Sequence, residues 1–128
     1  MPRELIGRWS VETAYVTPGP TAISAEGENV IRRLHFVHTR DHLQVCGKTI
    51  RIQRVETTSL NDDEFLQTYG FLPRLIHMKA PMVEVTLNSG QGTKACGEYE
   101  NLGAHLLFDR SGHLVMEVAN SYFSLKKQ

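Results

Sequence analysis

The feature of this sequence that most constrains its fold is the alternation of apolar and polar side chains over many short segments. Trp9, Val11 and Tyr15 lie with Thr13 on one face of the segment from residue 9 to residue 15, and residues 83–87 show a similar alternation. A period of two is typical of strands that are buried on one side only. Turn-forming residues follow about every 8–12 positions, and this spacing favours an antiparallel barrel or sandwich.

One segment has the pattern of a helix. Asn61 or Ser59 is suited to cap it, acidic residues 62–64 would lie at the positive end of its dipole, and Gly70 can end it. We therefore predict one short α-helix over about residues 61–69. Residues 21–29 are small and polar and indicate a loop, and residues 30–37 are expected to form the second strand.

The predicted fold is all-β. It is a small antiparallel β-barrel or bent sandwich of about eight strands with one short α-helix, in a single domain of residues 1–128. The same alternation occurs in both architectures, so the sequence leaves a closed barrel and an open sandwich as alternatives.

Charge and hydropathy exclude several classes of protein. The 128 residues include 14 basic and 14 acidic side chains, and a formal net charge of zero argues against a nucleic-acid partner. No apolar run approaches the roughly 20 residues of a membrane helix, so no transmembrane segment is expected.

The cellular location stays open between two alternatives. Residues 1–4 are polar and lack the apolar core of a signal peptide, which fits a cytoplasmic protein. A periplasmic or secreted protein from which the leader has been removed fits equally. Cys46 and Cys96 are the two cysteines of the chain, and they fit either a disulfide or two buried thiols in neighbouring strands.

The segment Gly7-Arg8-Trp9 at the start of the first predicted strand resembles the G-x-W opening of the calycin barrels. These are the lipocalins, the fatty-acid-binding proteins and the avidins, and the chain length is close to that of the shorter members. The resemblance implies that Trp9 plugs one end of a barrel. It also implies that a basic residue of the last strand, Lys126 or Lys127, packs on its ring. No ligand contact of these families can be transferred to a matching residue here.

A calycin-like lumen would hold one small apolar molecule. The predicted ligand-binding residues are Arg32, Phe36 and Tyr15. Arg32 falls on the more apolar face of the predicted second strand, where it could neutralise an anionic headgroup or pair with a buried carboxylate. Phe36 shares that face, and Tyr15 lies on the apolar face of the first strand.

No motif of catalysis or of metal binding is present. The sequence lacks G-x-S-x-G, a glycine-rich phosphate loop and a Cys or His set with metal-ligand spacing. Glu98 and Glu100 share one predicted strand face, and His105 and His113 flank a predicted hairpin. We expect no catalytic residues, no metal and no cofactor.

These observations predict a noncatalytic binding protein that holds a small hydrophobic ligand in a calycin-like barrel. One alternative is a protein-binding module of the bacterial envelope, such as a pilotin-type lipoprotein chaperone, a lysozyme inhibitor or an immunity protein. A second alternative is a small barrel cyclase or isomerase. The expected partner of this protein is a small apolar molecule or another protein.

Overall fold

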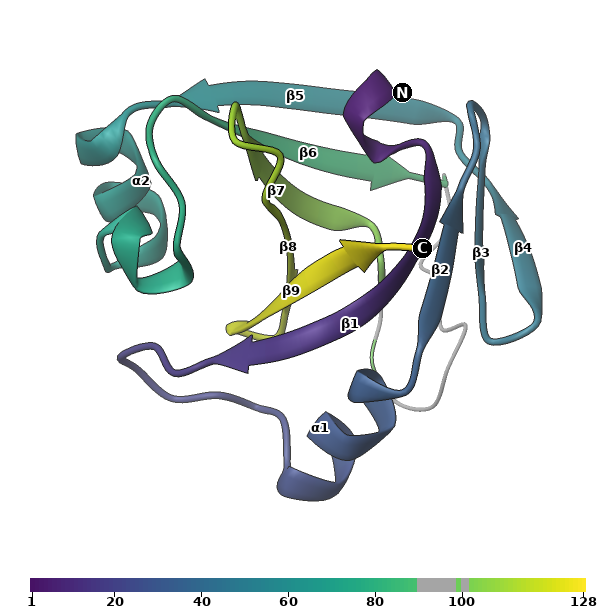
Figure 1. Cartoon of the computed structure of the whole chain (residues 1–128), viewed down its shortest axis with the longest axis horizontal. Helices are drawn as coiled ribbons and strands as arrows, with labels where there is room; N and C mark the ends of the chain where they lie inside the picture. The colour runs from purple at the N-terminus through teal and green to yellow at the C-terminus, as the bar shows by residue number, and fades with distance from the viewer. Residues whose placement is uncertain (90–98, 100–101) are drawn as a thin grey trace.

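The computed structural model describes residues 1–89, 99 and 102–128. Within these residues nine strands form one antiparallel sheet, in the order β4-β3-β2-β1-β9-β8-β7-β6-β5 (Figure 1). The strands are β1 (Gly7–Tyr15), β2 (His35–His38), β3 (His42–Val45), β4 (Lys48–Arg51), β5 (Arg54–Leu60), β6 (Met82–Asn88), β7 (His105–Asp109), β8 (Leu114–Val118) and β9 (Ser121–Lys127). The helices are α1 (Ala25–Arg32) and α2 (Asp62–Tyr69), with 3-10 turns η1 (Arg3–Leu5) and η2 (Pro73–Ile76).

The sheet is strongly curled into a half-barrel. Its two edge strands, β4 and β5, are separated in sequence only by residues 52 and 53, so the opposite ends of the sheet meet at one corner (Figure 1). The backbone of Ile52 donates to Asp41 and that of Gln53 donates to Asn88, which ties this corner to both sides of the sheet. An irregularity in the β1–β9 pairing between Val11 and Thr13 adds local bending. The predicted mostly-β fold is confirmed, as an open curled sheet.

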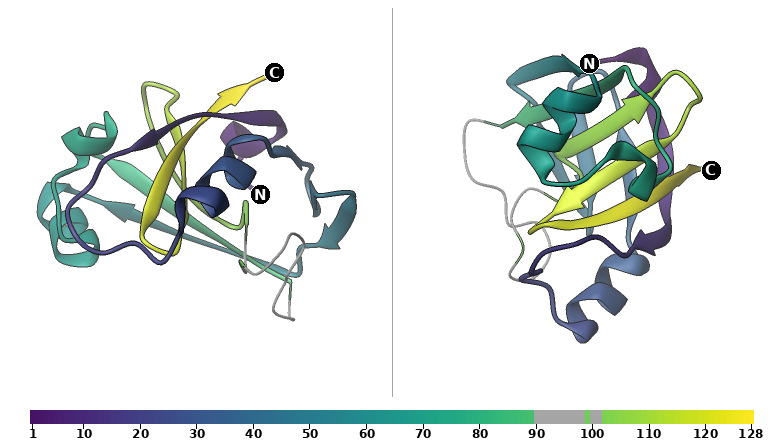
Figure 2. Two further views of the ribbon diagram at one scale, coloured as in Figure 1. Left: turned by 90° about the horizontal axis from the view of Figure 1, so that it is seen from below. Right: turned by 90° about the vertical axis from the view of Figure 1, so that its left-hand side faces the viewer.

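Alternation along the strands produces two cores on opposite faces of the sheet. The inner cluster lies within the curl and includes Trp9, Phe36 and Val85. The outer cluster lies between the other face and the α2–η2 segment, and it includes Phe65, Leu107 and Tyr122. Figure 2 shows α2 and η2 on one side of β6–β9 and strands β2–β4 on the other.

The predicted helix at residues 61–69 is confirmed as α2. The Asn61 side chain accepts from the backbone N–H of Glu64, and the Glu64 carboxylate accepts in return from the backbone N–H of Asn61. This reciprocal capping box satisfies two donors that a helix start otherwise leaves unpaired. Gly70 ends the helix in the left-handed region, with φ of 83°.

The prediction of a loop at residues 21–29 followed by a strand over residues 30–37 is wrong. Helix α1 covers residues 25–32, and the strand begins only at His35. Ser24 caps this helix by accepting from the backbone N–H of Gly27, and Ile31 is buried in the inner cluster. Arg32 therefore lies on a helix, not on the apolar face of a strand.

Trp9 is buried in the inner cluster. Its indole N–H donates to the carbonyl oxygen of Leu5 over 2.8 Å. The lysine above the ring is Lys127, whose Nζ lies 5.8 Å from the ring centroid. Lys127 pairs directly with Trp9 across β1 and β9, whereas the side chain of Lys126 points to the other face.

The close approach of Lys127 explains the glycine of the motif. A Cβ at Gly7 would lie 3.0 Å from Lys127 Cε, and Gly7 has a φ of 140° that other residues rarely adopt. The segment from Phe71 to Met82 is an irregular buried stretch, because Phe71, Ile76, Met78 and Met82 all belong to the outer cluster. Among the described residues, no helix is both long and apolar enough to cross a membrane.

Candidate functional site

Polar side chains from neighbouring strands meet on the outer face of the sheet, beside the area that α2 covers. They are Glu84 on β6, His105 on β7, Glu117 on β8 and Tyr122 on β9. The register brings them together: Glu117 pairs directly with Tyr122. His105 pairs with Thr86, so Glu84 is its diagonal neighbour.

The side chains form one hydrogen-bonded network with Tyr69 from the last turn of α2. The Tyr69 hydroxyl donates to Glu84, and Tyr69 Oη lies 3.1 Å from His105 Nε2. His105 Nδ1 lies 3.2 Å from Glu117 Oε2, and the other Glu117 oxygen accepts from the backbone N–H of Asn120. Both imidazole nitrogens of His105 are therefore engaged by protein groups.

Burial and hydrogen bonding set the charge state of this network. The bond from Glu117 raises the pKa of His105, by more than burial lowers it. Burial alone would raise the pKa of Glu117, but the bonds from His105 and Asn120 outweigh it and the pKa is lowered. Burial and the bond to Glu84 raise the pKa of Tyr69, so its hydroxyl stays protonated and acts as a donor.

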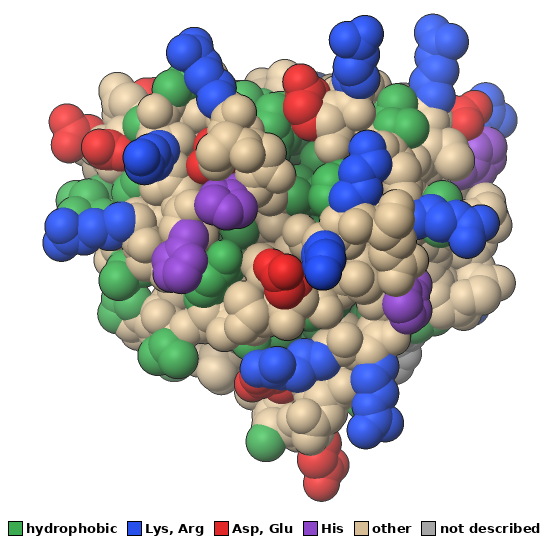
Figure 3. Space-filling view, in the orientation of Figure 1, with side chains coloured by type: hydrophobic (Ala, Val, Ile, Leu, Met, Phe, Trp, Pro, Cys, Tyr) green, Lys and Arg blue, Asp and Glu red, His purple; other side chains and the backbone are tan. Residues whose placement is uncertain are grey.

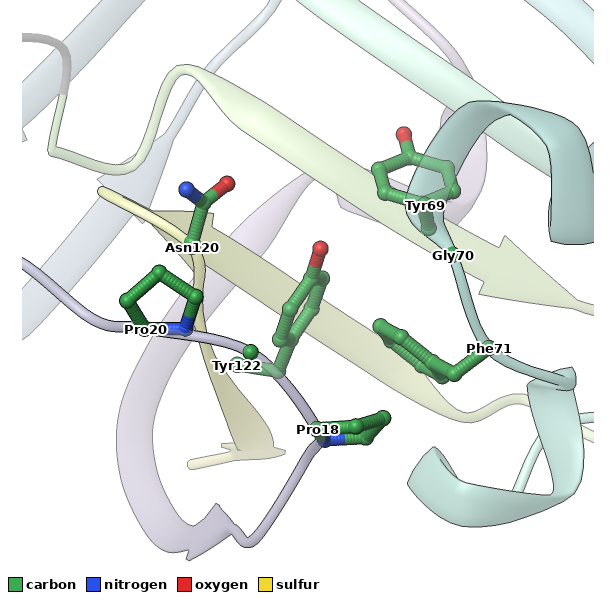
Figure 4. Close-up of a pocket in the computed structure, with 8 residues that line it drawn as sticks. Pro18, Pro20, Tyr69, Gly70, Phe71, Asn120 and Tyr122 are labelled. Atoms are coloured by element: carbon green, nitrogen blue, oxygen red, sulfur yellow. The ribbon is translucent and has the colours of Figure 1, made fainter.

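An open hollow of about 420 Å³ lies next to this network (Figure 4). We call it the aromatic hollow, and its lining is Pro18, Gly19, Pro20, Tyr69, Gly70, Phe71, Asn120 and Tyr122. The centroid of Tyr122 lies 5.0 Å from that of Phe71 and 6.0 Å from that of Tyr69, and both pairs are close to perpendicular. The three rings and the two prolines supply the apolar part of the walls, and polar atoms make up the rest of the lining.

Tyr122 contributes a polar group to these walls. Its side chain is only 4% exposed, yet no described residue forms a hydrogen bond with its hydroxyl. Figure 4 shows this hydroxyl pointing toward the space between Asn120 and Tyr69. The hydroxyl itself keeps contact with solvent, so it can bind a polar atom that enters the hollow.

Two further hollows lie nearby on the sheet. One of about 210 Å³ reaches the other side of the network and is lined in part by His105, Glu117 and Asn88. Another of about 470 Å³ opens at the inner face, between Glu4, Val83, Phe108 and Arg110. Val83 and Phe108 pack against the inner cluster, so this second hollow is the mouth of the curl.

The predicted ligand-binding residues do not form one site. Arg32 lies on the surface of α1, where its guanidinium is paired with Glu28 over 3.0 Å. Phe36 is fully buried in the inner cluster, and Tyr15 packs on the outer cluster with its ring 5.1 Å from that of His77. The strand assigned to residues 30–37 had placed Arg32 and Phe36 on one face, and helix α1 separates them.

The sequence interpretation missed the residues of the network. His105 and His113 do not pair across their hairpin: His105 bonds to Glu117, and His113 Nδ1 lies 3.3 Å from Ser111 Oγ. A usable signal was the position of Glu84 and Glu117 among the apolar residues of their strands, Glu84 between Val83 and Val85 and Glu117 between Met116 and Val118. The two predicted residues Glu98 and Glu100 lie outside the described ones, and so does Cys96, so a disulfide with Cys46 stays a prediction.

No group of three or more His, Cys, Asp or Glu side chains is arranged to hold a metal ion in the part of the chain that the structure describes. Lys and Arg side chains are spread over the face shown in Figure 3, with Asp and Glu between them, and they form no continuous patch there.

No protein-family model, curated protein or solved structure gave a significant match to this chain.

Proposed function

We propose that this chain is a noncatalytic binding protein for a small molecule, and that the ligand occupies the aromatic hollow. The observation that carries the proposal is the hydroxyl of Tyr122, which lies beside the rings of Tyr69 and Phe71, forms no hydrogen bond with a described residue and points into open space. Small-molecule sites combine aromatic walls with a few polar groups, and their volumes run from about 300 to 1,000 Å³.

The hydrogen bonding of His105 favours binding over catalysis. A general base needs a free lone pair directed at the substrate. Here Glu117 engages one imidazole nitrogen and Tyr69 the other, so the ring offers neither a lone pair nor a proton to the hollow. The same bonds hold Tyr69 in place, so the network acts as a rigid support for the wall of the site.

A calycin-like architecture is the finer structural proposal. Gly7, Trp9 and Lys127 have the arrangement that the family resemblance implies, and the sheet has the curl of a half-barrel. The hollow of about 470 Å³ beside Val83 and Phe108 offers this architecture a second place for a ligand, on the inner face. A ligand there would lie against the inner cluster, on the opposite side of the sheet from the aromatic hollow.

Amide and indole NMR signals distinguish the two places. We would titrate ¹⁵N-labelled protein with a library of small neutral, cationic and anionic fragments. Binding in the aromatic hollow is expected to shift the amide signals of Gly19, Gly70 and Asn120 and leave the indole N–H of Trp9 unchanged. Shifts of Trp9 with Val83 and Phe108 would move the site to the inner face, and a library without specific shifts would refute small-molecule binding.

A further inference from the structure

The walls of the aromatic hollow have the electrostatic character of a cation site. The ring of Tyr122 stands nearly perpendicular to the rings of both Tyr69 and Phe71. The face of an aromatic ring is the negative side of its quadrupole and attracts a cation within about 6 Å of its centre. Rings in several orientations can therefore contact different sides of one ammonium group.

The charged groups behind these rings are two carboxylates and one histidine. None of the eight lining residues that the structure describes is charged. Glu84 accepts from the Tyr69 hydroxyl, and Glu117 lies beside Tyr122 in the register of β8 and β9. His105 supplies at most one positive charge between these two carboxylates, so the network has a net negative charge when both are ionised.

The hydroxyl of Tyr122 adds an oxygen acceptor to this environment. Burial, together with the charge of Glu117, raises the pKa of Tyr122, so the group remains a neutral hydroxyl. It can accept from a ligand N–H or O–H, or donate to a ligand oxygen. A carboxylate or phosphate ligand would face the two glutamates without a basic partner among the lining residues.

We propose that the ligand of the aromatic hollow is a small organic cation, held by its ammonium group against the rings of Tyr69, Phe71 and Tyr122. This inference rests on the proposed function, because it assumes that the hollow is the binding site. The charge pattern selects a cation. The hollow's volume of about 420 Å³ limits the ligand to a compact headgroup rather than a long chain.

A pair of probes with the same shape tests the charge alone. Choline contains a quaternary nitrogen, and 3,3-dimethylbutan-1-ol has carbon in its place. We expect choline to shift the amide signals of Gly19, Gly70 and Asn120 and to bind roughly fivefold or more tightly than the alcohol. Glu117→Gln should reduce this preference, whereas Glu56→Gln on the exposed edge strand β5 should leave it unchanged. The unmodified protein already decides the comparison if Glu117→Gln does not fold.

Each outcome separates this inference from the proposed function. If the alcohol binds in the hollow as tightly as choline, the cation inference is overturned and small-molecule binding stands. The cation inference is also overturned if choline produces no shifts while neutral or anionic fragments shift the amide signals of the hollow. If neither the probes nor the fragment library produces shifts there, both the inference and the proposed function are overturned.

Discussion

At the scale of single residues, one buried carboxylate joins two distant segments of the chain. Asp109 ends β7, and its oxygens accept from the backbone N–H groups of Ser111 and His113 in the hairpin and of Lys79 before β6. Burial alone would raise the pKa of Asp109, but the hydrogen bonds from the Ser111 hydroxyl and from these backbone N–H groups outweigh it and the pKa is lowered. The sequence identified the hairpin from Asp109 to Gly112, but it did not reveal the bond to Lys79.

Replacing this carboxylate tests its structural role. Asp109→Asn retains the size of the side chain but removes one acceptor and the charge, so a buried N–H loses its partner. We expect the free energy of unfolding to fall by about 2 kcal/mol in urea denaturation. Asp41→Asn is the matched control, because Asp41 is exposed and, among the described residues, its side chain pairs with His42 alone. Equal losses of unfolding free energy in the two variants would contradict the structural role of the Asp109 carboxylate.

At the scale of elements, local signals explain which helix was predicted. Helix α2 has a strong cap at Asn61 and a glycine stop, and both act within one turn of the chain. Helix α1 has a Ser24 cap and a Glu28–Arg32 pair, but it contains Gly27 and the β-branched pair Val30-Ile31. Glycine weakens a helix and the β-branched pair favours a strand, and burial of Ile31 in the inner cluster overrides both preferences.

The cap of α2 gives a prediction at this scale. Asn61→Ala removes the acceptor for the backbone N–H of Glu64 and should lower the free energy of unfolding by about 1 kcal/mol. Asn61→Asp retains an acceptor at the same position and should retain stability, because a negative charge is favourable at a helix start. Thermal unfolding followed by circular dichroism compares the two variants. A loss of stability in both would mean that the amide itself, not its oxygen, is required.

Replacing the glycine inside α1 by alanine should have the opposite effect on stability from the one that helix propensity predicts. Alanine in place of glycine normally stabilises a helix by about 1 kcal/mol. A Cβ at Gly27 would collide with the Tyr99 hydroxyl and approach its Cζ to 2.9 Å. We therefore expect Gly27→Ala to destabilise the protein in urea denaturation. Adding Tyr99→Ala should make the same Gly27→Ala substitution neutral or favourable, and a stabilising single variant would show that α1 does not pack on Tyr99.

At the scale of the whole molecule, the candidate site arises from strand register and from the curl of the sheet. The sequence pattern can place Glu84 and Glu117 on outward positions, because the side-chain period within a strand is two. It cannot place His105 between them, since that depends on how β6, β7 and β8 align. The position of Tyr69 depends in turn on how α2 docks. The fold class was therefore predictable from local patterns, whereas the site required long-range pairing.

Two histidines on opposite faces of the sheet predict how stability depends on pH. His38 is buried in the curl, and burial lowers its pKa by more than the bond to the Gly103 carbonyl raises it. The unfolded chain then binds the proton more readily, so stability is lost as the pH falls below about 6.5. His105 has a raised pKa in the folded state. Its contribution is full below about 6.5 and is lost as the pH rises through that folded pKa.

The free energy of unfolding should therefore reach a maximum near pH 6.5 when urea denaturation is repeated between about pH 5 and 8. His38→Gln keeps a donor for the Gly103 carbonyl but cannot titrate, so it should flatten only the acidic side of the curve. His105→Gln should flatten only the alkaline side, because it removes the imidazolium that Glu117 stabilises. If either substitution flattened both the acidic and the alkaline side of the stability curve, one histidine would control the whole pH profile. The prediction that the two faces act independently would then be wrong. Separate effects would show that the curled sheet keeps its inner and outer cores electrostatically distinct.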